Sequence, residues 1–165
     1  MIIKHEKGSH TSTPFLAKIW LTAPCFSKAF SFTDSCKYNL NGEDQLDWNK
    51  LTGISFNLID ARQNTVMCGW RYNIEKDNFE LCAYYHISGS FNPPQKAICS
   101  VKSGERFEVN IKFNKANKSV AFEIVKADER FTENSNFEKF GICRQVNTWF
   151  GGNNPSPCDM HICCY

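Results

Sequence analysis

Apolar and polar residues alternate along several stretches of this chain, and this period of two constrains its fold more than any other feature. The clearest stretch covers residues 107–113. Its apolar members are Phe107, Val109, Ile111 and Phe113. Such a strand has one apolar and one polar face, which is typical of a half-buried antiparallel sheet. A polar turn at 114–118 follows, and the alternation resumes over 120–124, so the sequence predicts a β-hairpin here.

A second hairpin is predicted just before the first, from segments 66–74 and 79–87 around the polar turn 75–78. We expect this turn to pair Ile74 with Phe79. The pairs that follow on the polar side are Arg71 with Cys82, Gly69 with Tyr84, and Met67 with His86. Arg71, Tyr84 and His86 should therefore project from one face of the sheet, within diagonal reach of each other.

Further strands are predicted at residues 15–21, 25–32, 51–59, 97–101, 142–150 and 160–165. No stretch sustains a long helical period, although residues 43–51 could hold one or two turns. About eight to ten short strands predict an all-β fold, a single antiparallel β-sandwich of jelly-roll type with little helix. We expect residues 1–13 to form a flexible N-terminal arm and residues 14–165 to form the one sandwich domain, a size that can bury a full core.

The charge of the chain is nearly balanced, with 19 Lys and Arg against 17 Asp and Glu. This balance gives no electrostatic footprint for nucleic acid, so no nucleic-acid partner is expected. No apolar run is long enough for a membrane span, and residues 1–14 lack a signal-peptide pattern. We therefore expect neither a membrane partner nor a signal peptide.

The chain has nine cysteines, an odd number, so at least one thiol is free or bridges to another molecule. Four of them fall inside apolar strand-like runs, where a free cysteine packs as a small hydrophobe. They are Cys68, Cys82, Cys99 and Cys143. Reduced thiols predict a reducing location, either the cytoplasm or a host-cell interior, including a place in a phage particle. An exported protein with some disulfides stays open as the alternative.

The sheet face that carries Arg71, Tyr84 and His86 could bind a sugar or an anion. Aromatic rings accept the apolar face of a sugar, and a guanidinium donates to carboxylates and hydroxyls. The structural alternative is that Tyr84 covers Gly69 and that Arg71 lies along the ring. A third interpretation is a polysaccharide lyase, since Tyr and His can move protons while Arg neutralises a uronate. The chain lacks a second matched segment for that chemistry, so no catalytic residue is assigned.

Two segments resemble metal sites in composition. In the tail 158–164, strand alternation would send Asp159, His161 and Cys163 to one face and the other residues to the opposite face, so four ligands cannot converge. Oxygen-bearing residues also cluster around Gly42 as in calcium loops, but an Asx-rich turn leading into a short helix is the favoured interpretation. We expect no metal ion and no cofactor.

Three stretches carry a resemblance to lectin-like jelly-roll proteins of the concanavalin type. They are Ser35-Cys36-Lys37-Tyr38-Asn39-Leu40, Gly69-Trp70-Arg71-Tyr72-Asn73 and Trp149-Phe150-Gly151-Gly152-Asn153-Asn154-Pro155. The last two are also similar to segments of uncharacterised short proteins from gut bacteria and their phages. The resemblance covers residues 15–165 and implies a recognition or assembly module.

The sequence thus predicts a non-catalytic recognition module that binds a glycan. The expected ligand-binding residues are Arg71, Tyr84 and His86 on the sheet face, or Trp149, Asn153 and Asn154 on a rim. The alternative is a structural or assembly protein, such as an accessory component of a phage particle, with a protein partner or a second copy of itself. That alternative predicts an exposed apolar patch or a long exposed strand edge.

Overall fold

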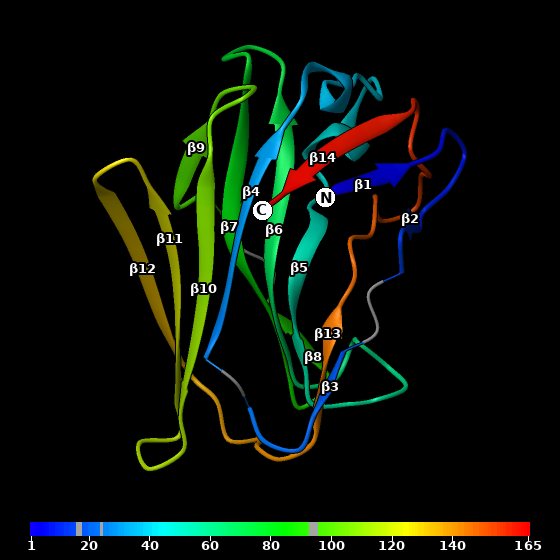
Figure 1. The fold of residues 1–165 in the computed structure, drawn as a ribbon. Helices are drawn as coiled ribbons and strands as arrows, with labels where there is room; N and C mark the ends of the chain where they lie inside the picture. Colours follow the sequence, from blue (N-terminus) through cyan, green and yellow to red (C-terminus); the bar gives the residue numbers. More distant parts are fainter. Residues whose placement is uncertain (16–17, 24, 93–95) are drawn as a thin grey trace.

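The computed structural model consists of two antiparallel sheets packed face to face (Figure 1). It describes residues 1–15, 18–23, 25–92 and 96–165. The first sheet contains β1 (Ile2–His5), β2 (Ser12–Thr13), β4 (Phe26–Phe32), β10 (Phe107–Asn114), β11 (Ser119–Lys126), β12 (Glu129–Asn136) and β14 (Met160–Cys164). The second contains β3 (Ile19–Trp20), β5 (Asn49–Ser55), β6 (Thr65–Asn73), β7 (Asn78–Ile87), β8 (Ser90–Asn92), β9 (Cys99–Val101) and β13 (Cys143–Val146).

The strand order is β12-β11-β10-β4-β14-β1-β2 in the first sheet and β3-β13-β5-β6-β7-β8 in the second, where β9 also pairs with β7. Only two short 3-10 helices occur in the described residues, η1 (Asp34–Cys36) and η2 (Glu43–Leu46). None of the helical segments there has the length and apolarity to cross a membrane. The predicted fold class, an antiparallel β-sandwich with little helix, is confirmed.

The core between the sheets is dominated by aromatic side chains. Phe32 from the first sheet stacks on Phe79 from the second at 4.5 Å between ring centroids, and its ring lies 4.8 Å from that of Trp70. Phe107 packs on the same ring at 5.5 Å. All four side chains are fully buried. Because each aromatic ring buries a large apolar area, this stack is a main contact between the sheets.

The predicted hairpin at 107–124 is confirmed. β10 and β11 pair in a continuous antiparallel register that closes at Asn114 and Ser119. Val109 and Ile111 of β10 and Val120 of β11 point into the core, as the alternation requires.

The register predicted for the second hairpin was wrong by two residues, although the two faces were assigned correctly. β6 and β7 close at Asn73 and Asn78, so Ile74 belongs to the turn. The Asn73 side chain accepts a hydrogen bond from the Lys76 amide at 3.1 Å, and Asp77 has a left-handed φ of 45°. These features fix the turn one position earlier than the apolar pattern suggests.

The actual partners on this ribbon therefore differ from the predicted ones. Arg71 lies opposite Glu80, Gly69 opposite Cys82, Met67 opposite Tyr84, and Thr65 opposite His86. A shift of two residues leaves each side chain on its face, because the side-chain period of a strand is two.

The N-terminal segment, expected as a flexible arm, contains two strands of the first sheet. β1 pairs with β14 over four residues and with β2 on its other side. The ammonium of Met1 donates to the Cys164 carbonyl at 2.8 Å. In Figure 1 the two ends of the chain lie side by side. Of the strand predicted at 15–21, residues 16–17 lie outside the described residues and β3 forms at 19–20.

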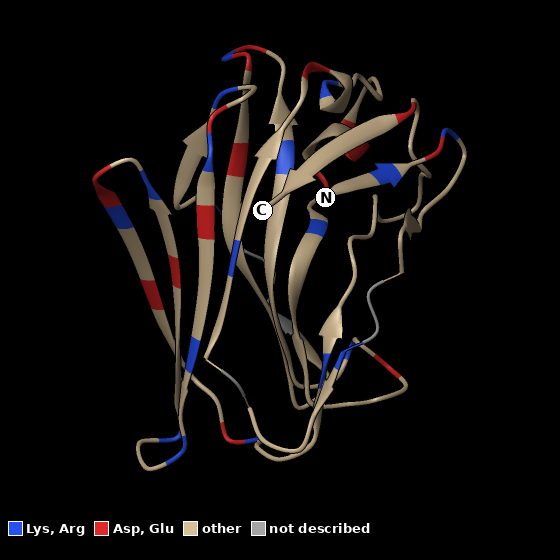
Figure 2. Cartoon of the chain, in the orientation of Figure 1, with Lys and Arg blue, Asp and Glu red and all other residues tan. Residues whose placement is uncertain are grey.

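Strand β12 was not predicted. It pairs with β11 along its whole length and forms one edge of the first sheet. Its residues are exposed or half-buried throughout, so no apolar alternation marks it. Figure 2 shows charged residues of both signs along this edge. The sequence of β12 contains Glu129, Arg130 and Glu133. Such charges protect a long edge strand from pairing with other chains.

The tail forms β14 with the predicted alternation. Met160, Ile162 and Cys164 are buried, while His161 is exposed. All nine cysteines lie in the described part of the chain and all are free. Five of them are buried, which agrees with a packing role for most of these thiols.

Candidate functional site

The face of the second sheet that points away from the core carries three of the predicted site residues. Arg71, Tyr84 and His86 alternate with core residues along β6 and β7. Tyr84 is part of a small apolar cluster that is separate from the main core and is called the outer cluster below. Its members are Trp48, Met67, Cys82, Tyr84 and Val146.

Tyr84 is too buried to serve as an open platform for a ligand. Its side chain is only 7% exposed because the other members of the outer cluster pack around it. Burial raises the pKa of Tyr84 to about 12, so its phenol is protonated at neutral pH. The burial of Tyr84 therefore agrees better with a packing role than with a ligand-binding role.

Gly69 allows the outer cluster to close. A Cβ at this position would lie 2.5 Å from the Cys82 Sγ and 3.5 Å from the Tyr84 ring. Any larger residue would displace these side chains. Tyr84 thus packs beside Gly69, as the structural interpretation expects.

Arg71 is engaged by its own protein. Its Nε forms an ion pair with Glu80 Oε2 at 2.8 Å, and its Nη1 donates to the Leu46 carbonyl at 2.9 Å. The guanidinium carbon lies 4.3 Å from the centroid of the Trp48 ring. Arg71 stacks on Trp48 rather than on Tyr84, and these contacts leave it little freedom to bind a ligand.

Glu80 is held in its charged form by this arrangement. Burial alone would raise its pKa, but the hydrogen bonds from Asn73 and Arg71 and the charge of Arg71 outweigh that effect and lower the pKa below its ordinary value. The distance from Asn73 Nδ2 to Glu80 Oε1 is 2.8 Å. Glu80 was not predicted as the partner of Arg71, because the predicted register placed Cys82 opposite Arg71.

His86 is half-buried next to Tyr84, with ring centroids 5.5 Å apart. Burial and the positive charge of Lys50 lower its pKa, whereas the carboxylate of Asp60 opposes them. The imidazole is therefore mostly neutral at physiological pH.

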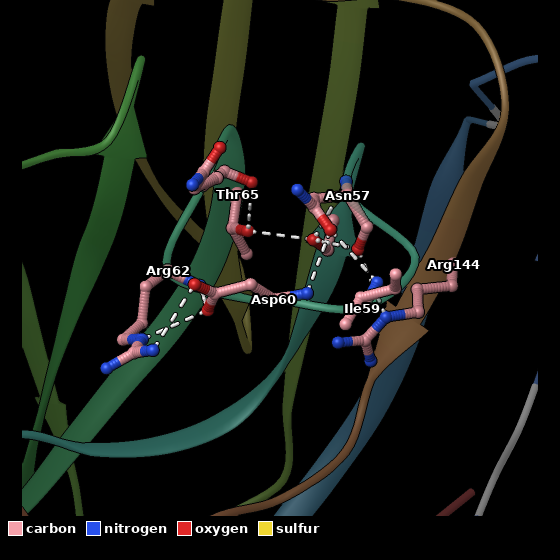
Figure 3. Close-up of polar contacts among 8 residues, drawn as sticks. Asn57, Ile59, Asp60, Arg62, Thr65 and Arg144 are labelled. Atoms are coloured by element: carbon pink, nitrogen blue, oxygen red, sulfur yellow. Dashed lines mark hydrogen bonds and ion pairs between the residues drawn. The ribbon is translucent and has the colours of Figure 1, made fainter.

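The loop that carries Asp60 has a well-defined network of hydrogen bonds (Figure 3). Asn57 Oδ1 accepts from the amides of Ile59 at 2.9 Å and Asp60 at 2.8 Å. Arg62 Nε pairs with Asp60 Oδ1 at 3.0 Å, and Arg144 donates to the Asn57 carbonyl at 3.2 Å. The network presents Ile59 to solvent, where it is 94% exposed.

Lys50, which was not predicted as a site residue, connects the sheet face with the rim that carries Trp149, Asn153 and Asn154. Its ammonium lies 5.1 Å from the centroid of the Tyr84 ring and donates to the Gly151 carbonyl at 3.3 Å. The backbones of Lys50 and Trp149 exchange two hydrogen bonds of 2.8 Å. No local sequence pattern identifies Lys50. Its role depends on the pairing of β5 with β6 and on the backbone pairing of Lys50 with Trp149, which is distant in the sequence.

The rim carries the exposed aromatic ring of the site. Trp149 is 43% exposed and stacks on His10 with 5.3 Å between ring centroids and an interplanar angle of 13°. His10 Nδ1 lies 2.8 Å from the Phe150 carbonyl, and the Phe150 amide donates to the His10 carbonyl at 2.9 Å. A residue from the predicted arm thus fixes the ring of Trp149.

The two asparagines of the rim differ in their surroundings. Asn153 is exposed, whereas Asn154 Nδ2 donates to Asp44 Oδ2 at 2.6 Å. Between Trp149 and Asn154 the chain turns at Gly151, whose φ is 76°, and a Cβ there would collide with the Asn154 carbonyl. The turn at Gly151 therefore places Asn154, and with it Asp44, close to the segment that carries Trp149.

The oxygen-rich segment around Gly42 forms the Asx-type turn that the sequence favoured. Asn39 Oδ1 accepts from the Asn41 amide at 3.0 Å, and η2 follows at Glu43. In the residues that the structure describes, no three His, Cys, Asp or Glu side chains are grouped closely enough to hold a metal ion. Asp44 instead supports the rim.

No family model matches this sequence, and no curated protein matches it. Among solved structures, the chain is similar to winged bean acidic lectin in complex with methyl-α-D-galactose, with a TM-score of 0.50 and 10% identity over 98% of this chain and 83% of that one. It also matches peanut lectin with a nine-residue peptide, with a TM-score of 0.43 and 9% identity over 98% and 94% of the two chains. At this identity the likeness to the winged bean lectin concerns the fold, a lectin-like β-sandwich.

Proposed function

We propose that this protein is a non-catalytic, lectin-like module that binds a carbohydrate at the rim. The rim consists of Trp149, Asn153 and Asn154, together with the residues that hold them, His10 and Asp44. The single observation that carries the proposal is the indole of Trp149, which is exposed to solvent and yet fixed in orientation by His10. The apolar C–H face of a sugar ring packs on such an indole without ordering a mobile side chain first.

Polar groups for the sugar hydroxyls surround the indole. Asn153 is exposed, and the Asn154–Asp44 pair presents an amide and a carboxylate. A few directional polar groups beside an aromatic surface are typical of sites that orient a small polar ligand. The lectin-like fold supports a binding role, since the winged bean lectin with the same architecture was solved with a galactoside bound.

The rim is preferred to the face with Arg71, Tyr84 and His86 because of accessibility. Arg71 is paired with Glu80, and Tyr84 is covered by the outer cluster. The same facts weigh against lyase chemistry at this face, because a buried phenol with a raised pKa is a poor group for taking a proton from a polymer.

A glycan array followed by titration calorimetry tests the proposal. We expect selective binding by the wild type and at least a tenfold loss of affinity, about 1.4 kcal/mol, in Trp149→Ala. Tyr165→Ala removes another exposed aromatic ring, at the C-terminus beside β4, and is the matched control. Unchanged binding in Trp149→Ala, or an array without any selective ligand, would contradict the proposal.

A second candidate function, docking onto another protein, is favoured by exposed apolar residues near β3 and β13. Ile19 pairs with Arg144 in the sheet, and Arg144 also bonds the loop that presents Ile59. Ile19 is 62% exposed and Ile142 51%. Light scattering of the wild type and of Ile59→Ser tests this candidate. A mass above that of the monomer, reduced by the substitution, supports it, and a monomer at all concentrations excludes self-assembly.

A further inference from the structure

A small cavity lies between the two sheets, on the inner side of β13 and β5. Ile3, Lys28 and Phe30 line it from the first sheet, and Leu51 and Thr52 from the second. Its other polar lining residues are Ser12, Gln145, Asn147 and Thr148. The space accommodates about one water-sized species, and the polar lining favours an occupied cavity over a dry one.

Lys28 has an unusual position for a lysine. It occupies an inward position of β4 between Phe26 and Phe30 and pairs with Val109, all three of which belong to the core. Cys164 and Lys18 act on its ammonium in opposite directions, the first raising its pKa and the second lowering it. In the described part of the chain no carboxylate forms an ion pair with Lys28. The side chain is half-buried, and burial is the largest cause of its lowered pKa, so its charge is less well solvated than at the open surface.

Thr52 provides a second group that lacks a partner. Its side chain is 1% exposed, and its hydroxyl finds no hydrogen-bond partner among the described residues. A buried hydroxyl without a partner is unfavourable, so a bound species that accepts its hydrogen bond would stabilise the fold. Lys28 and Thr52 approach the same cavity from opposite sheets.

We propose that this cavity, called the inter-sheet cavity here, is a binding site for a monatomic anion such as chloride. The ammonium of Lys28 and the hydroxyl of Thr52 are both donors, and an anion accepts from both. A water molecule would bond to both groups as well but would leave the charge of Lys28 without compensation. Phosphate, sulfate and carboxylates are larger than one water molecule and do not fit. The size of the cavity therefore selects a single-atom ion.

Halide titrations at constant ionic strength test the site, with sodium gluconate replacing sodium chloride or bromide. We expect the midpoint of thermal unfolding of the wild type to rise by about 2–4 °C with chloride and to saturate. The ³⁵Cl resonance should broaden in proportion to the protein concentration. Both responses should disappear in Lys28→Met, which keeps the side-chain length, and in the isosteric Thr52→Val.

Lys115→Met removes an exposed lysine at the tip of the β10–β11 hairpin and should keep both responses. If the wild type shows neither a halide-specific shift nor excess line width, the cavity holds only water and the proposal is wrong. Responses that persist in both cavity variants would also overturn it. Sugar binding does not enter these measurements, so the outcome is independent of the function of the rim.

Discussion

The imidazole of His10 lies almost parallel to the indole of Trp149, with 5.3 Å between the ring centroids. The two residues are far apart in the sequence, and the hydrogen bonds between His10 and Phe150 hold them together. The stack leaves part of the indole open to solvent while restricting its rotation. Such a fixed aromatic surface lowers the entropy cost of binding.

If the rim binds a sugar as proposed, removal of the imidazole should weaken that binding while the indole of Trp149 stays in place. We expect His10→Ala to reduce affinity by about three- to tenfold, as an aromatic pair contributes roughly 0.5–1.5 kcal/mol. Acrylamide should quench the fluorescence of Trp149 more strongly in His10→Ala than in the wild type. The Trp149 fluorescence is obtained by subtracting the signal of the same protein that also carries Trp149→Phe. His161→Ala replaces an exposed histidine elsewhere and should change neither quantity. Equal quenching in wild type and His10→Ala would show that the stack does not restrain the indole.

The ion pair between Arg71 and Glu80 should stabilise the fold rather than bind a ligand. Its side chains are only 20% and 12% exposed, so removal of one partner leaves a poorly solvated charge. We expect Arg71→Met to lower the free energy of unfolding by about 2 kcal/mol, less than the 3–5 kcal/mol typical of a fully buried pair. Glycan affinity should not change.

The same pair predicts a pH dependence. The pKa of Glu80 is lower in the folded than in the unfolded protein, so its contribution is present at neutral pH and is lost as the pH falls through the folded pKa. Urea unfolding of the wild type, Arg71→Met, Glu80→Gln and the double variant at pH 7 and below pH 4 measures this. A coupling between the two substitutions that does not weaken in acid would contradict the assignment.

His5 should make the protein sensitive to mild acid. Burial lowers the pKa of His5 to about 4 from an ordinary value of 6.5, with a backbone contact to Thr11 opposing in part. Because the unfolded chain binds the proton more readily, stability is full above pH 6.5 and falls towards pH 4, by about 3 kcal/mol. His5→Phe, which can keep the contact with Phe150, should flatten this part of the profile. A His5 resonance that titrates near pH 6.5 in the folded protein would refute the prediction.

The cysteines should be reduced and mostly unreactive in the folded state. Cys25 is exposed, whereas burial raises the pKa of Cys36 to about 11 and that of Cys99 to about 12. Since the thiolate is the reactive form, Ellman's reagent at pH 8 should modify Cys25 quickly and these two slowly. Under denaturing conditions most of the nine thiols should react, as expected for a protein from a reducing compartment. Recovery of eight oxidised cysteines would instead indicate an exported protein.

Local pattern was enough to predict much of the fold. The hairpin of β10 and β11 was predicted with its faces and turn, because Val109 and its neighbours alternate strictly. The β6–β7 hairpin had the right faces but the wrong register, because the side-chain hydrogen bond of Asn73 shifts the turn by one position and an apolar pattern does not contain that information. β12 was missed, since an exposed edge strand needs no apolar face.

The candidate site was predictable only in part. Trp149 and Asn153 were predicted as rim residues, and the structure leaves both accessible. Their supports His10 and Lys50 come from segments 139 and 99 positions away from Trp149 by their sequence numbers. Contacts between such distant segments depend on strand order, which one sequence does not reveal by pattern alone.

The assembly of the rim also determines when binding can begin during folding. His10, Asp44 and the segment 149–154 come from three widely separated parts of the chain, and the His10–Trp149 and Asp44–Asn154 contacts close large loops. Contacts of this kind form late because the entropy of loop closure is paid before they stabilise anything. If the rim binds a sugar as proposed, that binding reports complete folding: in a refolding experiment, β-sheet signal should recover first and ligand affinity last.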